Sequence, residues 1–459
     1  MKAARQWSVR HAAGLDRLYE AFAHVAPFLR PLATFVGSDR AERALTPIER
    51  GAKNLMFDCR MCGACVLRKT GMACPTNCGK AMRNGPCGGV RADGGCEVDP
   101  ATRCVWLEAR EGMRAINSRD AAPPSLPPID FSRQGRSTWI RVIEGAPAPE
   151  QGPAPPPRER PVHAFEAACR SGRFVTTVEI APPDSADPSA LLARAEKFVG
   201  LVDAVNITDG AGGNCHMSSA AAAAILAAHG HTPVCQIACR DRNRIAVQGD
   251  ILGAAALGVR NILCLTGDDV SQGDHPQAKP VFDLDAINLL RISRDMRDKG
   301  EFASGRKLET PPDLFLGATA NPFAPPFEDR IDNLEMKIDA GAQFIQTQFC
   351  FDLDLFRRFM DGVRARGLHD RARMIVGVGT LSSVKALRWM AHHVPGVHIP
   401  DSVLVRIANA DDQKAEGLAI LVETIQALRD IEGVAGVHLM GHRNEATLAE
   451  AIVQSGVRA

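Results

Sequence analysis

Eight of the fourteen cysteines in this chain are concentrated in one short stretch that contains no histidine. They are Cys59, Cys62, Cys65, Cys74, Cys78, Cys87, Cys96 and Cys104. Cysteines at this density hold a metal, hold an iron–sulfur cluster or form disulfides. The N-terminus lacks the apolar core of a secretion signal, and a reducing cytoplasm disfavours disulfides. We therefore expect a cytoplasmic protein with an inorganic centre.

The spacing within this stretch leaves the identity of the metal open. Cys59, Cys62 and Cys65 form a C-x2-C-x2-C run that is followed by Cys74-Pro75. This is the ligand pattern of a [4Fe–4S] cluster, with Cys74 or Cys78 as the fourth ligand. Eight thiolates would also make two zinc sites of four cysteines each. A cluster, zinc or one of each is compatible with the sequence.

A second set of candidate residues follows apolar segments further along the chain. Glu179 interrupts an apolar run, so we expect its side chain to point into a barrel, where burial favours the protonated acid. Asp268 follows Gly267, whose missing side chain lets a ligand approach the backbone. Gln348 offers both a donor and an acceptor, which suits the edge of a heterocycle. The structural alternatives are a Glu179–Arg or Glu179–Lys pair, a helix cap at Asp268 or Asp269, and a satisfied amide at Gln348.

The elements that must position these residues are eight short apolar runs, with helical patterns between them. The runs are 174–180, 204–207, 233–238, 261–265, 314–317, 344–347, 374–378 and 437–440. Eight strand–helix units in this length predict an α/β fold, a (β/α)8 barrel of the TIM type. A doubly wound open sheet is disfavoured because no G-x-G-x-x-G follows the first run. In such a barrel the active site lies at the carboxyl ends of the strands.

The remaining sequence divides into three parts before the barrel. We expect a helical segment at 1–50, a cysteine-rich domain at 51–120, a Pro-rich linker at 121–160 and the barrel at 161–459. The net charge of +1 gives no electrostatic case for binding nucleic acid or an anionic membrane. No run of about 18 apolar residues is present that would span a membrane.

Several motifs of the barrel segment resemble those of methylenetetrahydrofolate reductases. The run 178–183, Val-Glu-Ile-Ala-Pro-Pro, resembles that family's F-E-x-x-P-P, and 265–268, Leu-Thr-Gly-Asp, resembles its L-R-G-D. The run 337–342, followed by Thr-Gln-Phe at 347–349, is similar to K-x-D-A-G-A…T-Q-F-F. The resemblance covers roughly residues 165–450, with the motifs in the family's order.

This resemblance implies a flavoenzyme that reduces 5,10-methylenetetrahydrofolate to 5-methyltetrahydrofolate, or runs the reverse oxidation. The family binds FAD in the barrel and passes a hydride to the folate, its electrons coming from NAD(P)H or a protein donor. By resemblance, Glu179 protonates the folate, Asp268 lies between flavin and pterin, and Gln348 binds the pterin. The positions that map onto FAD contacts are Thr208, Gln236, Asp268, Asn333 and Lys337. Gln236 stands where the family usually has histidine.

The cysteine-rich stretch resembles the partner domain of these reductases, which is associated with zinc or iron–sulfur in anaerobic one-carbon metabolism. The resemblance implies that the two domains are fused here. Two other hypotheses remain open. The protein would be a flavin-free pterin-binding accessory of a corrinoid methyl-transfer system, or a scaffold whose cysteine domain docks a partner. The sequence does not determine the electron donor. It also leaves the oligomeric state open, and a homo-oligomer is one of the alternatives.

Overall fold

The computed structural model describes residues 2–116, 125–146, 152–394 and 396–458. The chain divides into two compact units: Met1–Pro86 with Asp93–Pro153, and Cys87–Ala92 with Ala154–Ala459. Parts of the expected linker, at 121–124 and 147–151, lie outside the described residues. Within the described part of the chain, no helix is both long enough and apolar enough to cross a membrane.

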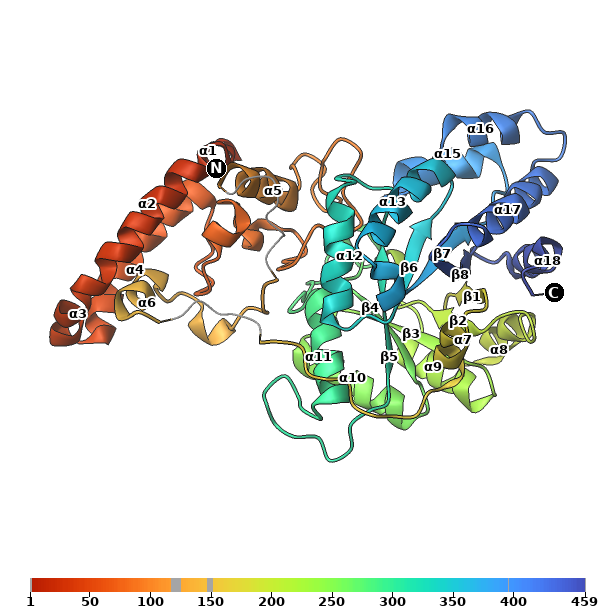
Figure 1. Cartoon of the computed structure of the whole chain (residues 1–459), viewed down its shortest axis with the longest axis horizontal. Coiled ribbons are helices and arrows are strands. Elements are labelled where there is room, and N and C mark those ends of the chain that lie inside the picture. The colour runs from red at the N-terminus through yellow and green to blue at the C-terminus, as the bar shows by residue number, and fades with distance from the viewer. Residues whose placement is uncertain (1, 117–124, 147–151, 395, 459) are drawn as a thin grey trace. The chain divides into compact units, whose positions relative to one another are not determined.

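The first unit is helical around a cysteine-bearing stretch of loops and short turns (Figure 1). Its helices are α1 (Lys2–Arg10), α2 (Ala12–Val25), α3 (Arg30–Val36), α4 (Ser38–Phe57), α5 (Val105–Ile116) and α6 (Thr138–Glu144). Its 3-10 turns are η1 (Ala26–Leu29), η2 (Leu67–Thr70), η3 (Pro75–Asn77) and η4 (Phe131–Arg133). The cysteines between α4 and α5 therefore lie on irregular backbone, as in small domains organised by a metal.

One part of the expected linker is packed. Ser137 caps α6 by accepting a hydrogen bond from the backbone N–H of Ile140. Ile140 and Ile143 on that helix are buried together with Ala26 and Ala33. Residues 131–144 therefore differ from the surrounding Pro-rich sequence, because a helix cap and an apolar pair are present there.

The second unit is a closed barrel of eight parallel strands, which confirms the predicted fold class. The strands are β1 (Val175–Ile180), β2 (Ala204–Ile207), β3 (Pro233–Ala238), β4 (Asn261–Leu265), β5 (Phe315–Ala320), β6 (Phe344–Phe349), β7 (Arg373–Gly379) and β8 (Val434–Met440). Each strand pairs with the next in sequence, and β8 closes the ring against β1. All eight carboxyl ends therefore meet at one end of the barrel.

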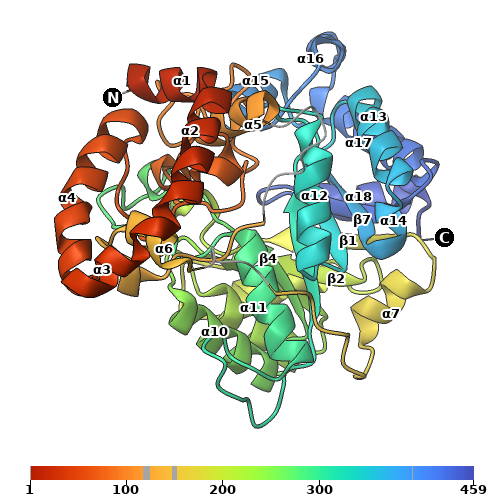
Figure 2. The same cartoon turned by 60° about the vertical axis from the view of Figure 1, so that its left-hand side comes forward.

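Helices surround the strands, and Figure 2 shows α10, α11 and α12 along the outside of the barrel. The helices of this unit are α7 (Ala164–Arg170), α8 (Ser189–Glu196), α9 (Ser219–Ala228), α10 (Arg244–Ala256), α11 (Ala286–Asp298), α12 (Asp329–Ala340), α13 (Leu353–Ala365), α14 (Leu368–Arg371), α15 (Val384–His393), α16 (Asp401–Ala408), α17 (Gln413–Arg429) and α18 (Glu445–Ser455). Two 3-10 turns, η5 (Ala211–Gly213) and η6 (Val270–Gln272), follow β2 and β4.

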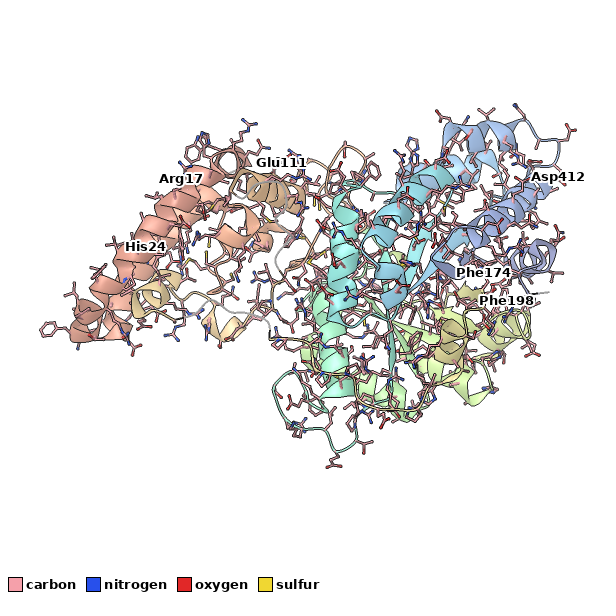
Figure 3. The ribbon with its side chains drawn as sticks, viewed as in Figure 1. Arg17, His24, Glu111, Phe174, Phe198 and Asp412 are labelled. Atoms are coloured by element: carbon pink, nitrogen blue, oxygen red, sulfur yellow. The ribbon has the colours of Figure 1, made fainter. Side chains whose placement is uncertain are left out.

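The apolar core has two parts. One lies between the strands and their helices and includes Phe198, which follows α8 and is labelled in Figure 3. The other fills the amino end of the barrel, where Phe165 on α7 meets Phe315 and Phe344 edge to ring at centroid distances of 5.7 and 5.3 Å. Among the described residues these rings fill the amino end, which leaves the carboxyl ends of the strands as the side for a ligand.

Candidate active site

Glu179 lies at the carboxyl end of β1 and faces polar side chains from two other strands. Gln236 on β3 donates from Nε2 to Glu179 Oε2 at 2.9 Å. His438 on β8 places Nε2 at 3.7 Å from the same oxygen. The side chain of Glu179 is 28% exposed, so it borders the barrel opening. Among the described residues its polar partners are an amide and an imidazole, not the arginine or lysine of the structural alternative.

A buried polar layer lies one step below Glu179 along the strands. Thr177 Oγ lies 2.9 Å from His438 Nδ1, and Gln346 Nε2 lies 3.3 Å from the same nitrogen. Gln346 and Asn206 exchange two hydrogen bonds of 2.6 and 3.1 Å. With Nδ1 held by these two neighbours, the opposite ring nitrogen, Nε2, faces Glu179. The layer thus fixes the orientation of the imidazole.

The site residues predicted from the sequence did not include His438, Thr177, Asn206 or Gln346, because the prediction rested on the strand ends. A signal was present: each of Thr177, Asn206 and Gln346 stands two residues before an expected site residue. On a strand, residues two apart share a face, so these side chains had to point into the barrel. His438 lies two residues before Met440, the last residue of β8.

Thr208 follows β2 and has a buried hydroxyl with no hydrogen-bond partner among the described residues. A buried hydroxyl left unpaired is costly, so a partner from outside the chain would stabilise it. The next residue, Asp209, accepts from the backbone N–H of Ala238 at 2.8 Å and from Arg242 at 2.5 Å. These bonds tie the end of β2 to β3 and hold Thr208 in place.

Asp268 follows β4 and is exposed, with Oδ2 accepting the backbone N–H of Gly212 in η5 at 2.8 Å. Gly267 before it has a positive φ of 94°. The neighbouring Asp269 stands at the N-cap position before η6, but its side chain accepts from the Ser271 hydroxyl and makes no capping bond to a backbone N–H. Asp268 therefore remains a carboxylate at the opening with one oxygen bonded to the loop after β2.

Gln348 is the second-last residue of β6. The register between β6 and β7 shifts between Gln346 and Phe349. Such irregularities re-aim side chains and recur beside active sites. Its Oε1 accepts from the backbone N–H of Phe349 at 3.0 Å. Its side-chain NH2 group has no hydrogen-bond partner among the described residues, so Gln348 presents a donor at the same end of the barrel as Glu179.

Asn333 and Lys337 lie on α12, on the outer side of β5. Asn333 is buried, and Lys337 Nζ donates to the carbonyl of Thr319 on β5 at 2.7 Å. Burial, helped by the nearby Arg330, lowers the pKa of Lys337 to about 8. The structure thus brings Glu179 and Gln236 into contact, whereas Asn333 and Lys337 approach the barrel from the helix layer.

Four cysteines of the first unit line one small cavity: Cys59, Cys62, Cys65 and Cys74. Lys53, Arg83 and Arg136 line it as well. Burial raises the pKa of Cys74 to about 12, and the thiols of Cys59 and Cys62 add to that shift. These four cysteines are the C-x2-C-x2-C run and the following Cys-Pro of the sequence.

A second group contains Cys78, Cys96 and Cys104. Burial raises the pKa of Cys78 to about 12, with smaller contributions from Cys104 and Cys96. Cys87 belongs to the other unit, where Arg330 donates to its carbonyl at 2.7 Å. No disulfide joins any of the fourteen cysteines, all of which are among the described residues. Within those residues, no three His, Cys, Asp or Glu side chains are arranged to hold a single metal ion.

Two family models match the chain. The family model described as methylenetetrahydrofolate reductase matches residues 164–456, which is the barrel and well over half of the chain. The chain belongs to the methylenetetrahydrofolate reductase family. A second model, described as the C-terminal region of methylene-tetrahydrofolate reductase, matches residues 39–132 and so includes all eight clustered cysteines.

Relatives in this family are distant. Methylenetetrahydrofolate reductase 1 of Schizosaccharomyces pombe is 26% identical over 232 residues, which cover 49% of this chain and 36% of the relative. The 5,10-methylenetetrahydrofolate reductase of Pectobacterium carotovorum is 28% identical over 208 residues, which cover 44% of this chain and 62% of the relative. The chain therefore spans less than two thirds of the length of either relative.

Among solved structures, the barrel is similar to a protein from Clostridium thermocellum that binds two copies of 5-methyl-5,6,7,8-tetrahydrofolic acid. The TM-score is 0.45 at 14% identity, covering 64% of this chain and 98% of the other. A likeness this distant adds nothing to the assignment of the site.

Proposed function

We propose that this protein interconverts 5,10-methylenetetrahydrofolate and 5-methyltetrahydrofolate by hydride transfer through FAD bound at the carboxyl end of the barrel. The observation that carries the proposal is Glu179 at the barrel opening, bonded to Gln236 and facing His438, in a chain of the reductase family. Such an acid is positioned to give a proton to a substrate that enters from the only open end.

The residues present fit a flavin. Thr208 offers a buried, unpaired hydroxyl, and Lys337 carries a cation on the helix that follows β5. We infer that Thr208, Gln236, Asn333 and Lys337 hold FAD, and that Lys337 meets its phosphates. Bound FAD supplies the hydride.

The chain's own residues then act on the folate. Glu179 protonates the folate nitrogen, which opens the five-membered ring to an iminium and makes the methylene carbon a better hydride acceptor. Gln236 and His438 keep the carboxyl group oriented toward the opening, because both contact the same oxygen. Gln348 hydrogen-bonds the pterin, and Asp268 borders the space between pterin and flavin.

A threonine pair provides the test of flavin binding. Thr208→Val should weaken FAD binding about tenfold, the order of one lost hydrogen bond to a ligand. Thr176→Val is the matched control, since Thr176 also has a buried hydroxyl without a partner among the described residues but lies within β1. Titration of the apoprotein with FAD measures both. Equal affinities for Thr208→Val and the wild type would contradict the placement of FAD at Thr208.

We further propose that the cysteine-rich region is the fused partner domain of the reductase and holds an iron–sulfur centre at Cys59, Cys62, Cys65 and Cys74. The four thiols line one cavity, which fits such a centre. Among the described residues they are not close enough together to coordinate a single metal ion. A cluster is broader than one metal ion, so its ligands stand further apart. A protein or NAD(P)H would then supply electrons.

The alternative hypothesis, a flavin-free pterin-binding accessory, makes a different prediction for the purified protein. It requires no FAD after anaerobic purification and no effect of Thr208→Val. The reductase reading requires about one FAD per chain and a flavin spectrum that a reductant bleaches. The unpaired hydroxyl of Thr208 favours the reductase.

A further inference from the structure

A buried ion pair borders the cavity of the first cysteine group. Lys53 and Glu49 stand four residues apart on α4 and are 4% and 0% exposed. Both line the cavity that Cys59, Cys62, Cys65 and Cys74 share. Burying two charges is expensive, and a buried pair is often no more stabilising than apolar residues of the same volume. Its presence beside the cysteines therefore needs an explanation other than stability.

The Lys53 ammonium has two hydrogen-bond partners among the described residues. It donates to Glu49 Oε1 and to Thr138 Oγ, the latter at 2.7 Å. A lysine ammonium has three donors and no acceptor, so one N–H group is left for the cavity that Lys53 lines. A buried cation with a donor to spare thus borders the expected cluster ligands.

Glu49 is held mainly by the start of α6. Its oxygens accept from the hydroxyls of Ser137 and Thr138, each at 2.5 Å, and from the backbone N–H groups of Thr138 and Trp139 at 3.2 and 3.1 Å. These four hydrogen bonds offset much of the negative charge of Glu49, so the positive charge of Lys53 is left beside the four cysteines.

The expected centre carries a negative charge, which a nearby cation would stabilise. Four thiolates outweigh the positive charge of a [4Fe–4S] core, so the centre is anionic and becomes more so when it accepts an electron. A cation in a low-dielectric site favours the more negative state. Hydrogen bonds to the sulfurs also set the potential of such clusters.

We propose that the buried ammonium of Lys53, which lines the same cavity as Cys59, Cys62, Cys65 and Cys74, raises the reduction potential of an iron–sulfur centre held by these cysteines. This inference rests on the iron–sulfur centre proposed above. The step concerned is the entry of one electron into the centre, with no bond formed or broken. Glu49 opposes the effect in part, since its charge lies on the other side of Lys53.

An anaerobic redox titration of the full-length protein with dithionite, followed by electron paramagnetic resonance of the reduced centre, tests the proposal. Lys53→Met should lower the equilibrium constant for reduction about tenfold, which is a fall of about 59 mV for one electron. Lys53→Arg keeps the cation and should restore most of the potential. Lys69→Met is the matched control: Lys69 is exposed in η2, four residues after Cys65, and its loss should leave the midpoint unchanged.

Glu49→Gln separates electrostatics from packing. It keeps the size of the side chain but removes the negative charge, so the midpoint should rise, opposite to the change in Lys53→Met. A general loosening of the pocket would shift both variants in the same direction, and that result would overturn the proposal. If Lys53→Met does not retain its centre, Glu49→Gln decides: a higher midpoint supports the proposal, and an unchanged or lower one overturns it.

The outcomes distinguish this inference from the function on which it rests. Wild-type protein without iron and sulfide would overturn both the proposed centre and the role of Lys53. A wild-type centre whose midpoint is the same in Lys53→Met would overturn the role of Lys53 alone.

Discussion

Glu179, Gln236 and His438 come from three different strands and meet at one carboxylate oxygen. The polar layer beneath them, with Thr177, Gln346 and Asn206, is fully buried and bonded to itself. Satisfied buried networks hold their members in one arrangement. The acid is therefore oriented by residues that do not themselves reach the opening.

Replacement of Glu179 by glutamine tests its role as the general acid. Glu179→Gln keeps the shape of the side chain and an oxygen that can accept from Gln236, but it removes the transferable proton. Turnover of 5,10-methylenetetrahydrofolate should fall by about 10²- to 10⁴-fold, while FAD binding is retained. Steady-state rates and FAD content measure the two effects. Unchanged turnover would exclude Glu179 as the proton donor.

The pH dependence of FAD binding tests Lys337. Burial lowers the pKa of Lys337 to about 8, so the apoprotein loses this cation as the pH rises above that value. If the charged form binds the FAD phosphates, affinity should be constant below about pH 8 and should fall with rising pH above it. Lys337→Met should bind FAD more weakly and lose this dependence. The same pH profile in wild type and Lys337→Met would contradict the assignment.

The sequence predicted the position of each barrel strand, but it predicted the first and last residues of the strands less accurately. β2, β3 and β4 have the predicted bounds, because each is a short apolar run followed by polar or glycine residues. The predicted run at 314–317 ends before β5 does, since Ala318 and Ala320 have weak strand propensity and are kept in the strand by pairing with β6. β8 begins at Val434, before the predicted 437, because Gly436 breaks the apolar run.

The position of the candidate residues at the strand ends could be predicted from the sequence, but their contacts could not. The motifs pointed to Glu179, Thr208, Asp268 and Gln348, all of which stand at carboxyl ends of strands. The bond between Glu179 and Gln236 joins strands that are not neighbours, so it depends on the closure and stagger of the barrel. No local pattern carries that information.

One glycine tests how tightly the barrel interior is packed at the closed end. A Cβ added at Gly317 on β5 would lie 2.2 Å from the ring of Phe344 on β6. Gly317→Ala should therefore destabilise the barrel by about 1–3 kcal/mol, the usual effect of overpacking a core. Gly249→Ala on α10, which meets nothing within 4 Å, is the control and should not destabilise the fold. Chemical denaturation compares them; equal stability of the two variants would contradict the packing described.

At the scale of the whole molecule, two compact units divide the chemistry expected of the protein. The barrel unit carries the acid and the candidate flavin site, and the helical unit carries the cavity lined by four cysteines. The sequence predicted both parts, but not which cysteines share a cavity. Spacing allowed Cys74 or Cys78 as the fourth member, and the structure groups Cys74 with the first three.

Metal analysis of cysteine variants tests this grouping. Cys59→Ala should lower the iron content by one centre per chain, because a cluster with a missing thiolate is lost. Cys215→Ala is the control, since Cys215 is exposed and lies in the barrel unit, and it should leave iron unchanged. Iron, sulfide and zinc are measured per chain after anaerobic purification. The same metal content in Cys59→Ala and the wild type would exclude Cys59 as an essential ligand.

If FAD and the folate meet at the open end of the barrel beside the acid Glu179, reduced flavin should pass its hydride directly to the folate. Anaerobic mixing of the reduced, FAD-loaded protein with 5,10-methylenetetrahydrofolate tests this in a single turnover. The absorbance of oxidised flavin should return at the rate at which 5-methyltetrahydrofolate forms, and Glu179→Gln should slow both together. Flavin that stays reduced in the wild type, or product that forms without flavin oxidation, would contradict it.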